Sequence, residues 1–401
     1  MGKKYTLIPQ GTVTSPRGFQ AGAIYAGIKK PSPDALDLGL LFSEAPCSVT
    51  GLFTTNRIKA APVVISKKHL SNGTAQAVVM NSGCANACTG EQGMSDAMEI
   101  AIATAQRLSI SPENVLMAST GVIGKILPIE LIIGNIPLIK LSPHGGHDLE
   151  KAIMTTDTKP KEIAYQTADY IIGGIAKGSG MIHPNMATLL CLLTTDAAVE
   201  LNFLKFALKE AIDNSLNMIS VDGDTSTNDT VFLLSNSLSG SDLITKSSRG
   251  AELFQQTLNK VCINLAKNIV RDGEGAKRLI EVSVSSAISI VDARRAARTV
   301  ISSPLVKSAI YGADPNWGRI IAAVGRSGVD VIESKIDLYI DDIQLVKAGE
   351  PLPFDSQKVS LSMNKPEVLI NVELNQGKVK ATAWGCDLSE EYVTINSHYT
   401  T

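Results

Sequence analysis

Short apolar runs separated by Gly, Asn and Pro fill the first part of the chain, and runs of this length between turn-forming residues predict β-strands. Three of these runs are residues 40–42, 63–65 and 77–80. Residues 91–108 differ, because their apolar side chains recur at helical spacing and predict an amphipathic helix. Residues 115–118 form another predicted strand, which leads directly into Ser-Thr-Gly.

The second half of the chain alternates less regularly. Residues 189–193 have the length and polarity of a buried strand, and residues 202–218 follow as an amphipathic helix. A further helix is predicted at residues 252–270, a strand with alternating polarity at 278–286 and a helix at 292–301.

The end of the chain contains more strands. Residues 311–319 predict a tight turn before a short apolar helix at 320–324, and strand follows strand from Lys335 onward. Strands at both ends with helices between them predict an α+β fold, with mixed sheets packed on each other and helices outside. A doubly wound sheet fits less well, because helices are scarce in the first and last quarters.

Composition limits the classes of function. With 401 residues, 44% of them apolar, the chain is long enough for two domains or one large layered one. A net charge of -2 argues against a nucleic-acid or membrane partner and favours small-molecule substrates. No segment approaches the ~18 apolar residues of a membrane helix and no signal peptide is recognisable, so we expect a cytoplasmic protein.

Neither the cysteines nor the acidic residues predict a metal site. Six cysteines in so long a chain suggest reduced thiols, and the close pair Cys84 and Cys88 lacks the further ligands that a zinc site needs. The polar stretch 221–230 alternates oxygen-bearing side chains but does not match a calcium-binding loop. Hydrogen-bonded turns are the preferred interpretation of that stretch.

Candidate chemistry centres on residues 176–195. Thr188 stands where a Gly- and Pro-containing loop meets the predicted strand, directly after Ala187. A cut before Thr188 would give it a free α-amine with a pKa near ~8, which can serve as its own general base. Lys177 on the same loop could tune that amine or hold the hydroxyl. Thr120 and the Gly121 N–H, at a strand tip, could stabilise an oxyanion.

Glu274 lies between two glycines after a predicted helix. The helix end explains the glycines but not the acid. Glu274 is therefore either a solvated turn residue or a site residue, and the sequence pattern leaves both open.

Eight segments resemble the ornithine acetyltransferase family, the bifunctional glutamate N-acetyltransferases of arginine biosynthesis, in that family's order. They span essentially the whole chain: residues 81–90, 119–124, 152–158, 177–190, 220–230, 271–276, 313–319 and 396–401. The resemblance implies an ArgJ/DmpA-like fold of the N-terminal-nucleophile type, with α-β-β-α layers. It also implies that the chain cuts itself between Ala187 and Thr188 into an α chain, 1–187, and a β chain, 188–401.

The implied reaction moves the acetyl group of N2-acetyl-L-ornithine to Thr188 and then to L-glutamate by a ping-pong mechanism. No cofactor is needed, since both half-reactions share one covalent intermediate. Acetyl-CoA is a possible co-substrate in a second activity, and a heterotetramer of two α and two β chains is the implied assembly.

The resemblance also assigns roles to residues. Thr120 and Gly121 match the oxyanion hole, and Lys177, Thr188 and Glu274 match catalytic or substrate-contacting positions. Asn396 and Thr401 match residues that bind the amino-acid end of the substrate, as does a threonine of the Thr155-Thr156 pair, for which we choose Thr155. The remaining candidates are interpreted as structural: His183, Asp387, Glu390 and Glu391.

Two other classes of function remain. An N-terminal-nucleophile hydrolase or aminopeptidase would share Thr188 and its cleavage but pass the acyl group to water. A binding protein without catalytic activity would keep an uncut chain.

Overall fold

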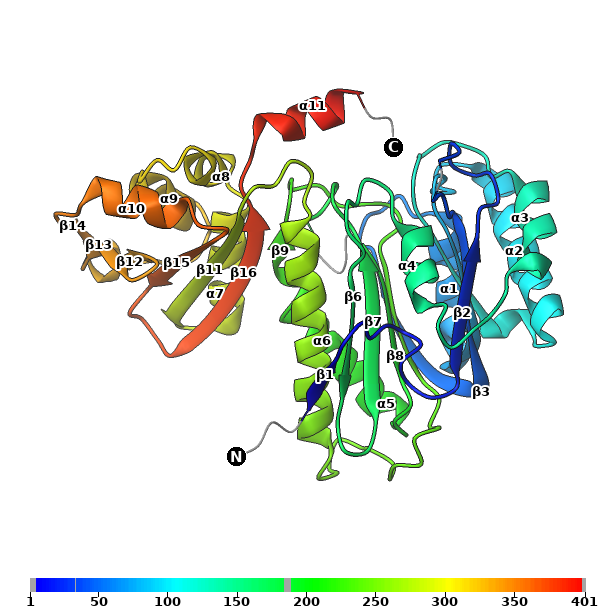
Figure 1. Cartoon of the computed structure of the whole chain (residues 1–401). Coiled ribbons are helices and arrows are strands. Elements are labelled where there is room, and N and C mark those ends of the chain that lie inside the picture. The colour runs from blue at the N-terminus through cyan, green and yellow to red at the C-terminus, as the bar shows by residue number, and fades with distance from the viewer. Residues whose placement is uncertain (1–4, 33, 184–188, 399–401) are drawn as a thin grey trace.

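The computed structural model describes residues 5–32, 34–183 and 189–398, which form two lobes on either side of a long helix, α6 (Figure 1). A nine-stranded mixed sheet builds the first lobe, in the order β1-β6-β7-β8-β10-β3-β4-β5, with β2 also paired to β3. Its strands are β1 (Thr6–Ile8), β2 (Phe19–Ile24), β3 (Leu38–Phe53), β4 (Thr74–Asn81), β5 (Val115–Ser119), β6 (Glu162–Gln166), β7 (Ile171–Lys177), β8 (Leu190–Thr195) and β10 (Thr230–Ser235).

The long strand β3 joins two halves of this sheet. Its first part pairs with β2 and its last part with β10, and the register against β4 shifts between Phe42 and Cys47. Side chains alternate along each strand, so each half has two apolar faces. Val78 of β4 and Leu192 of β8 share one core between the halves, whereas Val79 and Leu193 point to the outer helices.

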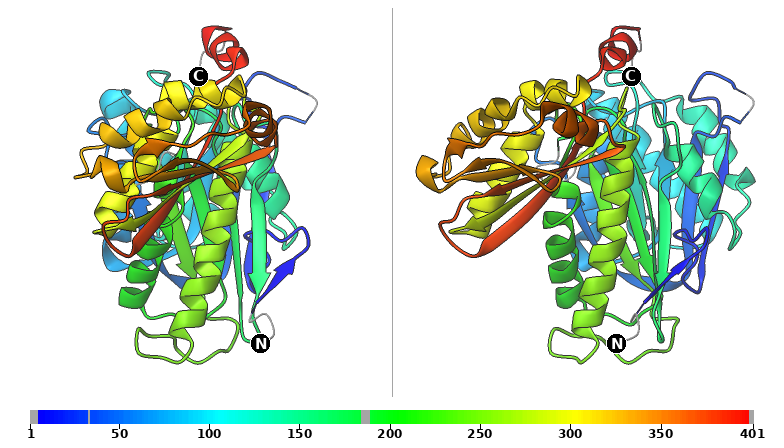
Figure 2. Two further views of the ribbon diagram at one scale, coloured as in Figure 1. Left: turned by 90° about the vertical axis from the view of Figure 1, so that its left-hand side faces the viewer. Right: turned by 60° about the vertical axis from the view of Figure 1, so that its left-hand side comes forward.

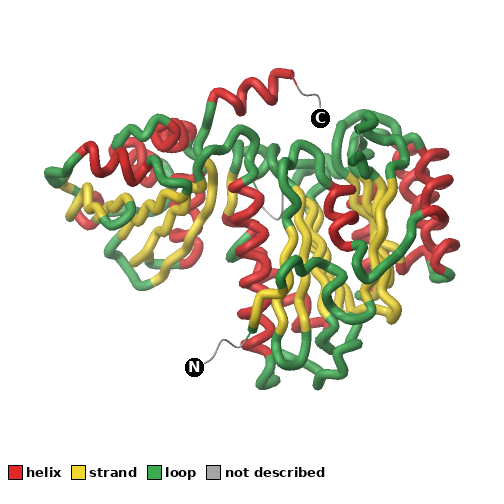
Figure 3. Tube along the Cα trace, in the orientation of Figure 1, coloured by secondary structure: helices red, strands yellow, loops and turns green. Residues whose placement is uncertain are grey.

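The first lobe therefore has four layers, as predicted. In Figure 3 the strands lie between helices on both sides. Helices α1 and α2 cover the half that contains β4 and β5, and α5 and α6 cover the half that contains β7 and β8. One detail differs from the prediction: the two packed sheets are hydrogen-bonded halves of one bent sheet. The helices are α1 (Ala61–His69), α2 (Gly90–Leu108), α3 (Ile129–Asn135), α4 (Gly146–Ile153), α5 (Leu201–Asp213) and α6 (Ala251–Arg271).

The second lobe is a seven-stranded sheet in the order β14-β13-β12-β15-β11-β16-β9. Helix α6 lies between the two sheets (Figure 2) and packs against both. Buried apolar side chains of the two lobes form one core. The elements are β9 (Ile219–Ser220), β11 (Leu279–Ala287), α7 (Ile290–Ile301), α8 (Pro304–Tyr311), α9 (Trp317–Gly325), β12 (Asp337–Ile340), β13 (Ile343–Lys347), β14 (Glu350–Pro351), α10 (Ser356–Met363), β15 (Glu367–Glu373), β16 (Val379–Cys386) and α11 (Glu390–His398).

Most predicted elements are confirmed, but residues 63–65 are not a strand. They belong to α1, which starts with Pro62 in its first turn and buries Val63 and Ile65 while Val64 stays exposed. A short apolar run does not distinguish a strand from one buried helix face. The last quarter also contains three helices that the pattern did not predict: α8, α10 and α11. Among the described residues, no helix combines the length and apolarity that a membrane span requires.

Candidate active site

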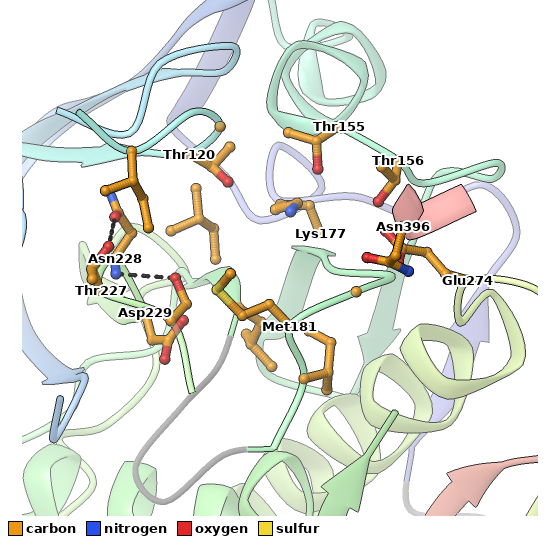
Figure 4. A pocket seen from close by; sticks show the side chains of 17 residues that line it. Thr120, Thr155, Thr156, Lys177, Met181, Thr227, Asn228, Asp229, Glu274 and Asn396 are labelled. Carbon is orange, nitrogen blue, oxygen red and sulfur yellow. Dashed lines mark hydrogen bonds between the residues drawn. The ribbon is translucent and has the colours of Figure 1, made fainter. Parts of the chain in front are cut away.

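One pocket collects most of the predicted site residues (Figure 4). It encloses about 750 Å³, open space at its mouth included, and lies where β5 and β7 end and β8 and β10 begin. Six residues named from the sequence line it: Thr120, Gly121, Thr155, Lys177, Glu274 and Asn396. Ala187, Thr188 and Thr401 lie outside the described residues. Leu189 and Leu190, the next residues after Thr188, line the same pocket.

The strand tip after β5 has a backbone shape that only glycine fits. Gly121 has φ +122°, and a Cβ there would lie 2.5 Å from the carbonyl carbon of Gly83 and 2.6 Å from the nitrogen of Cys84. The Thr120 N–H donates to the Asn81 carbonyl at 3.0 Å, which fixes the tip against β4. The backbone around Gly121 is therefore rigidly placed at the pocket wall, as an oxyanion hole requires.

Lys177 is the last residue of β7, whereas the sequence pattern predicts a loop at this position. It is 8% exposed, and its Nζ lies 4.0 Å from Oδ2 of Asp157. Burial would raise the pKa of Asp157, but the charges of Lys177 and Lys161 outweigh burial and lower the pKa to about 2. Asp157 is thus a buried carboxylate facing Lys177. It belongs to the 152–158 segment, in which the family resemblance assigns a role only to a threonine.

Glu274 lines the pocket and is buried, so it is not a solvated turn residue. It is 8% exposed, its N–H donates to the Ser179 carbonyl at 3.0 Å, and its Oε2 accepts from Nδ2 of Asn396 at 2.7 Å. A Cβ on Gly180 would lie 2.4 Å from the Glu274 carboxylate, so a larger residue there would displace this carboxylate from its present position. Asn396 comes from α11, which reaches from the second lobe over the strands of the first (Figure 1).

The structure leaves the choice between Thr155 and Thr156 open. Both line the pocket, and both are partly exposed. Their side chains point toward the pocket in Figure 4.

The polar stretch before β10 also belongs to the pocket. The Asn228 N–H donates to Oγ of Ser226 at 3.2 Å, a local hydrogen bond of the kind predicted for turns. Its Nδ2 donates to the carbonyls of Ala85 (2.6 Å) and Ser119 (2.8 Å), which ties the stretch to neighbouring segments. The sequence interpretation missed that Thr227, Asn228 and Asp229 face the pocket. Their position directly before a buried strand, like that of Thr188, was the available signal. No cluster of metal-ligating side chains occurs among the residues that the structure describes.

Comparison with known proteins gives one family. A model of the ArgJ family matches residues 20–401. The arginine biosynthesis bifunctional protein ArgJ of Dehalococcoides mccartyi is 53% identical, and the match covers 100% of both chains. The protein of the same name from Symbiobacterium thermophilum is 50% identical over 98% of this chain and 99% of its own.

This chain belongs to the ArgJ family. A crystal structure of the arginine biosynthesis bifunctional protein ArgJ from Bacillus halodurans is 42% identical and has a TM-score of 0.50. The match covers 51% of this chain and 97% of that one. The resemblance seen in the sequence motifs is therefore confirmed at the level of the family.

His183 anchors the chain ahead of the predicted cut in this ArgJ-family protein. Arg298 donates to Nε2 of the ring at 3.1 Å, which leaves Nδ1 as the protonated nitrogen, 3.0 Å from the hydroxyl of Ser220. Burial and the neighbouring charge of Arg298 lower the pKa of His183 to about 4. The imidazole is thus neutral at neutral pH, and its two hydrogen bonds connect this part of the chain to Ser220 and Arg298.

The lowered pKa predicts an acid-sensitive contribution to stability. The ordinary pKa of histidine is 6.5. Between this pH and about pH 4, the unfolded chain binds a proton at His183 that the folded chain does not. The free energy of unfolding should therefore fall as the pH drops through this window. In chemical denaturation between pH 7 and 4, the free energy of unfolding of His183→Gln should fall less steeply than that of the wild type. Equal slopes for the two proteins would contradict this role of His183.

Proposed function

We propose that this ArgJ-family chain transfers the acetyl group of N2-acetyl-L-ornithine to L-glutamate through an acetyl-Thr188 intermediate, as a cytoplasmic enzyme of arginine biosynthesis. The pocket carries this proposal, because it places Gly121, Lys177 and Glu274 around the start of β8. The relatives' shared name, arginine biosynthesis bifunctional protein, supports the pathway.

Activation requires one cut in the chain. The Thr188 hydroxyl attacks the Ala187 carbonyl carbon, the acyl group moves from nitrogen to oxygen, and water then hydrolyses the ester. This leaves a carboxylate on Ala187 and a free α-amine on Thr188. The Bacillus halodurans chain, which corresponds to 51% of this one, has the length that a cut near the middle would give.

The two products, 1–187 and 188–401, would stay together. Strand β7 of the first pairs with β8 of the second, and β3 pairs with β10. The pocket also needs both, because Gly121 and Lys177 come from one and Glu274 and Asn396 from the other. The expected assembly is a heterotetramer of two α and two β chains.

Transfer then uses Thr188 twice. Its α-amine takes the hydroxyl proton while Oγ attacks the acetyl carbonyl, and Thr120 and the Gly121 N–H stabilise the oxyanion. Collapse expels ornithine, whose amine takes the proton. The amine of glutamate attacks the resulting ester in the same way, so the two half-reactions need no cofactor. A second activity with acetyl-CoA as acetyl donor would load the same hydroxyl.

The amino-acid end of both substrates would meet Glu274, Asn396, Thr401 and one of the two threonines, Thr155 by our choice. Lys177 would favour the neutral form of the Thr188 amine, because a nearby positive charge lowers the pKa of an amine.

Intact mass spectrometry before and after incubation with N2-acetylornithine tests the proposal. We expect two chains that meet between residues 187 and 188, with one acetyl group gained on the C-terminal chain and lost again when glutamate is added. Steady release of acetate without glutamate would instead establish the N-terminal-nucleophile hydrolase. A single uncut 42.5 kDa chain would contradict the proposal.

Asn396→Ala should weaken substrate binding more than chemistry. Its amide donates to the Glu274 carboxylate, so its loss frees that acid and opens one side of the pocket. We expect KM for N2-acetylornithine to rise about 10-fold with kcat within about 3-fold. Thr394→Ala is the matched control, because its hydroxyl bonds to the Glu390 carbonyl within α11. Steady-state kinetics showing the same KM for both variants would exclude Asn396 from substrate binding.

A further inference from the structure

Asp157 lies beside the pocket, where the 155–161 segment meets the end of β7. Its Oδ1 accepts from the Gly178 N–H at 2.7 Å and from Nζ of Lys161 at 2.6 Å, and its Oδ2 accepts from the Thr155 N–H at 3.0 Å. Nζ of Lys177 lies 4.0 Å from Oδ2. The side chain of Asp157 is 0% exposed, so these groups take the place of water around the carboxylate.

A second buried ion pair extends this arrangement to Asp272, at the end of α6. Lys161 also donates from Nζ to Oδ2 of Asp272 at 2.7 Å. Burial alone would lower the pKa of Lys161, but Asp157 and Asp272 raise it above its ordinary value. Asp272 stands two residues before Glu274, and its carbonyl accepts from the Ser179 hydroxyl at 2.6 Å. Positive and negative charges therefore alternate from Lys177 through Asp157 and Lys161 to Asp272.

Such a row is poorly explained by stability alone. Removing several charges from water is unfavourable, and well-packed apolar side chains of similar volume often stabilise a protein equally well. Such a row of charges does fix the positions of the segments that carry it, because each buried charge must stay beside its partners of opposite charge. Asp157 orders Thr155 and Gly178 through their backbone N–H groups, and it attracts Lys177 at 4.0 Å without a direct hydrogen bond. In Figure 4 the Lys177 amine lies in the pocket, close to Thr155.

We propose that Asp157 is a positioning residue for acetyl transfer, which sets the place of the Lys177 amine, the Thr155 backbone and the start of the segment that leads to the cut. This inference rests on the proposed function, because it assigns Asp157 a role in that same reaction. Asp157 lines no part of the pocket itself and acts through these three neighbours.

A double-mutant cycle tests whether Asp157 acts through Lys177. The rate of Thr188 acetylation in a single turnover is followed by quenched intact mass in the wild type, Asp157→Asn, Lys177→Met and the double variant. We expect Asp157→Asn to slow acetylation about 10- to 100-fold in the wild type but less than about 3-fold when Lys177 is already Met. Losses that simply multiply would overturn the proposal, as would an unchanged rate in Asp157→Asn.

Asp196→Asn is the matched control. Asp196 is also a buried acid that accepts two backbone N–H bonds, from Arg17 (3.0 Å) and Ile171 (2.8 Å), but it holds the opposite end of β7. The Asp196→Asn variant should be less stable than the wild type but should acetylate Thr188 at the wild-type rate. If Asp196→Asn slows acetylation as much as Asp157→Asn does, the role of Asp157 is only structural.

A variant that fails to fold is replaced by Asp157→Asn/Lys161→Met, which removes one charge of each sign together. The same cycle with Lys177→Met is then run in that background. Absence of acetyl-Thr188 in the wild type would contradict the proposed function. Normal acetylation in the wild type and in the Asp157 variants would contradict only the role of Asp157.

Discussion

Replacing Thr188 with alanine should abolish both self-cleavage and acetyl transfer. One hydroxyl is proposed to attack the Ala187 carbonyl first and the acetyl carbonyl afterwards, and alanine offers no nucleophile for either step. We expect a single uncut chain on a denaturing gel and a fall in transfer of at least about 10,000-fold. Intact mass and an ornithine-release assay measure the two effects on the same preparation.

Thr188→Ser is the control, because it keeps the hydroxyl nucleophile and removes only the methyl group of the side chain. Serine retains the hydroxyl and, once cut, an α-amine, so cleavage and transfer should persist at a reduced rate. Circular dichroism should show folded protein for both variants. A Thr188→Ala protein that is cut and active would require a different nucleophile.

Replacing Gly121 with alanine should nearly eliminate acetylation while the fold survives. The added Cβ would meet backbone atoms of Gly83 and Cys84 at 2.5 and 2.6 Å, and backbone cannot rotate away as a side chain could. The tip that carries Thr120 and the Gly121 N–H must then shift, and oxyanion donors tolerate little displacement. We expect a single-turnover acetylation rate about 100- to 1,000-fold below wild type.

Gly124→Ala is the control for this prediction. Gly124 stands on the same loop with φ +78°, so alanine strains its backbone too, but a Cβ there meets nothing within 4 Å. Gly124→Ala should therefore lose some stability, about 1 kcal/mol, and keep its acetylation rate. If Gly121→Ala and Gly124→Ala acetylate Thr188 equally fast, the strand tip is not the oxyanion site.

The sequence predicted elements best where one physical signal dominated. The helix expected at residues 91–108 is α2, Gly90–Leu108, and the helix expected at 252–270 is α6, Ala251–Arg271. Both bury a face defined by helical periodicity over several turns. The run at 63–65 gave no such signal, because three apolar residues fit one turn of a helix as well as a strand. Helix α10 was missed although Asp355 caps it by accepting from the N–H groups of Gln357 and Lys358.

The candidate site likewise contains residues that local motifs predicted and residues that they did not. Motifs named Thr120, Gly121, Lys177, Glu274 and Asn396 because their residue types and neighbours resemble a family, and the pocket brings these residues together. The motifs gave no reason to single out Asp157, since its role depends on the charges that surround it. They also placed Lys177 in a loop, because the end of a strand is set by pairing with another strand and not by local pattern.

The sequence by itself determined the family, the layered α+β class and six of the residues that line the pocket. Only the tertiary structure decided that Glu274 is buried against Asn396, 122 positions away along the chain, and that Lys177 and Asp157 share a buried row of charges. The physical reason is that burial and long-range contacts depend on the path of the whole chain. Local patterns record which side chains avoid water, whereas the folded chain decides which polar groups must share the few places from which water is excluded.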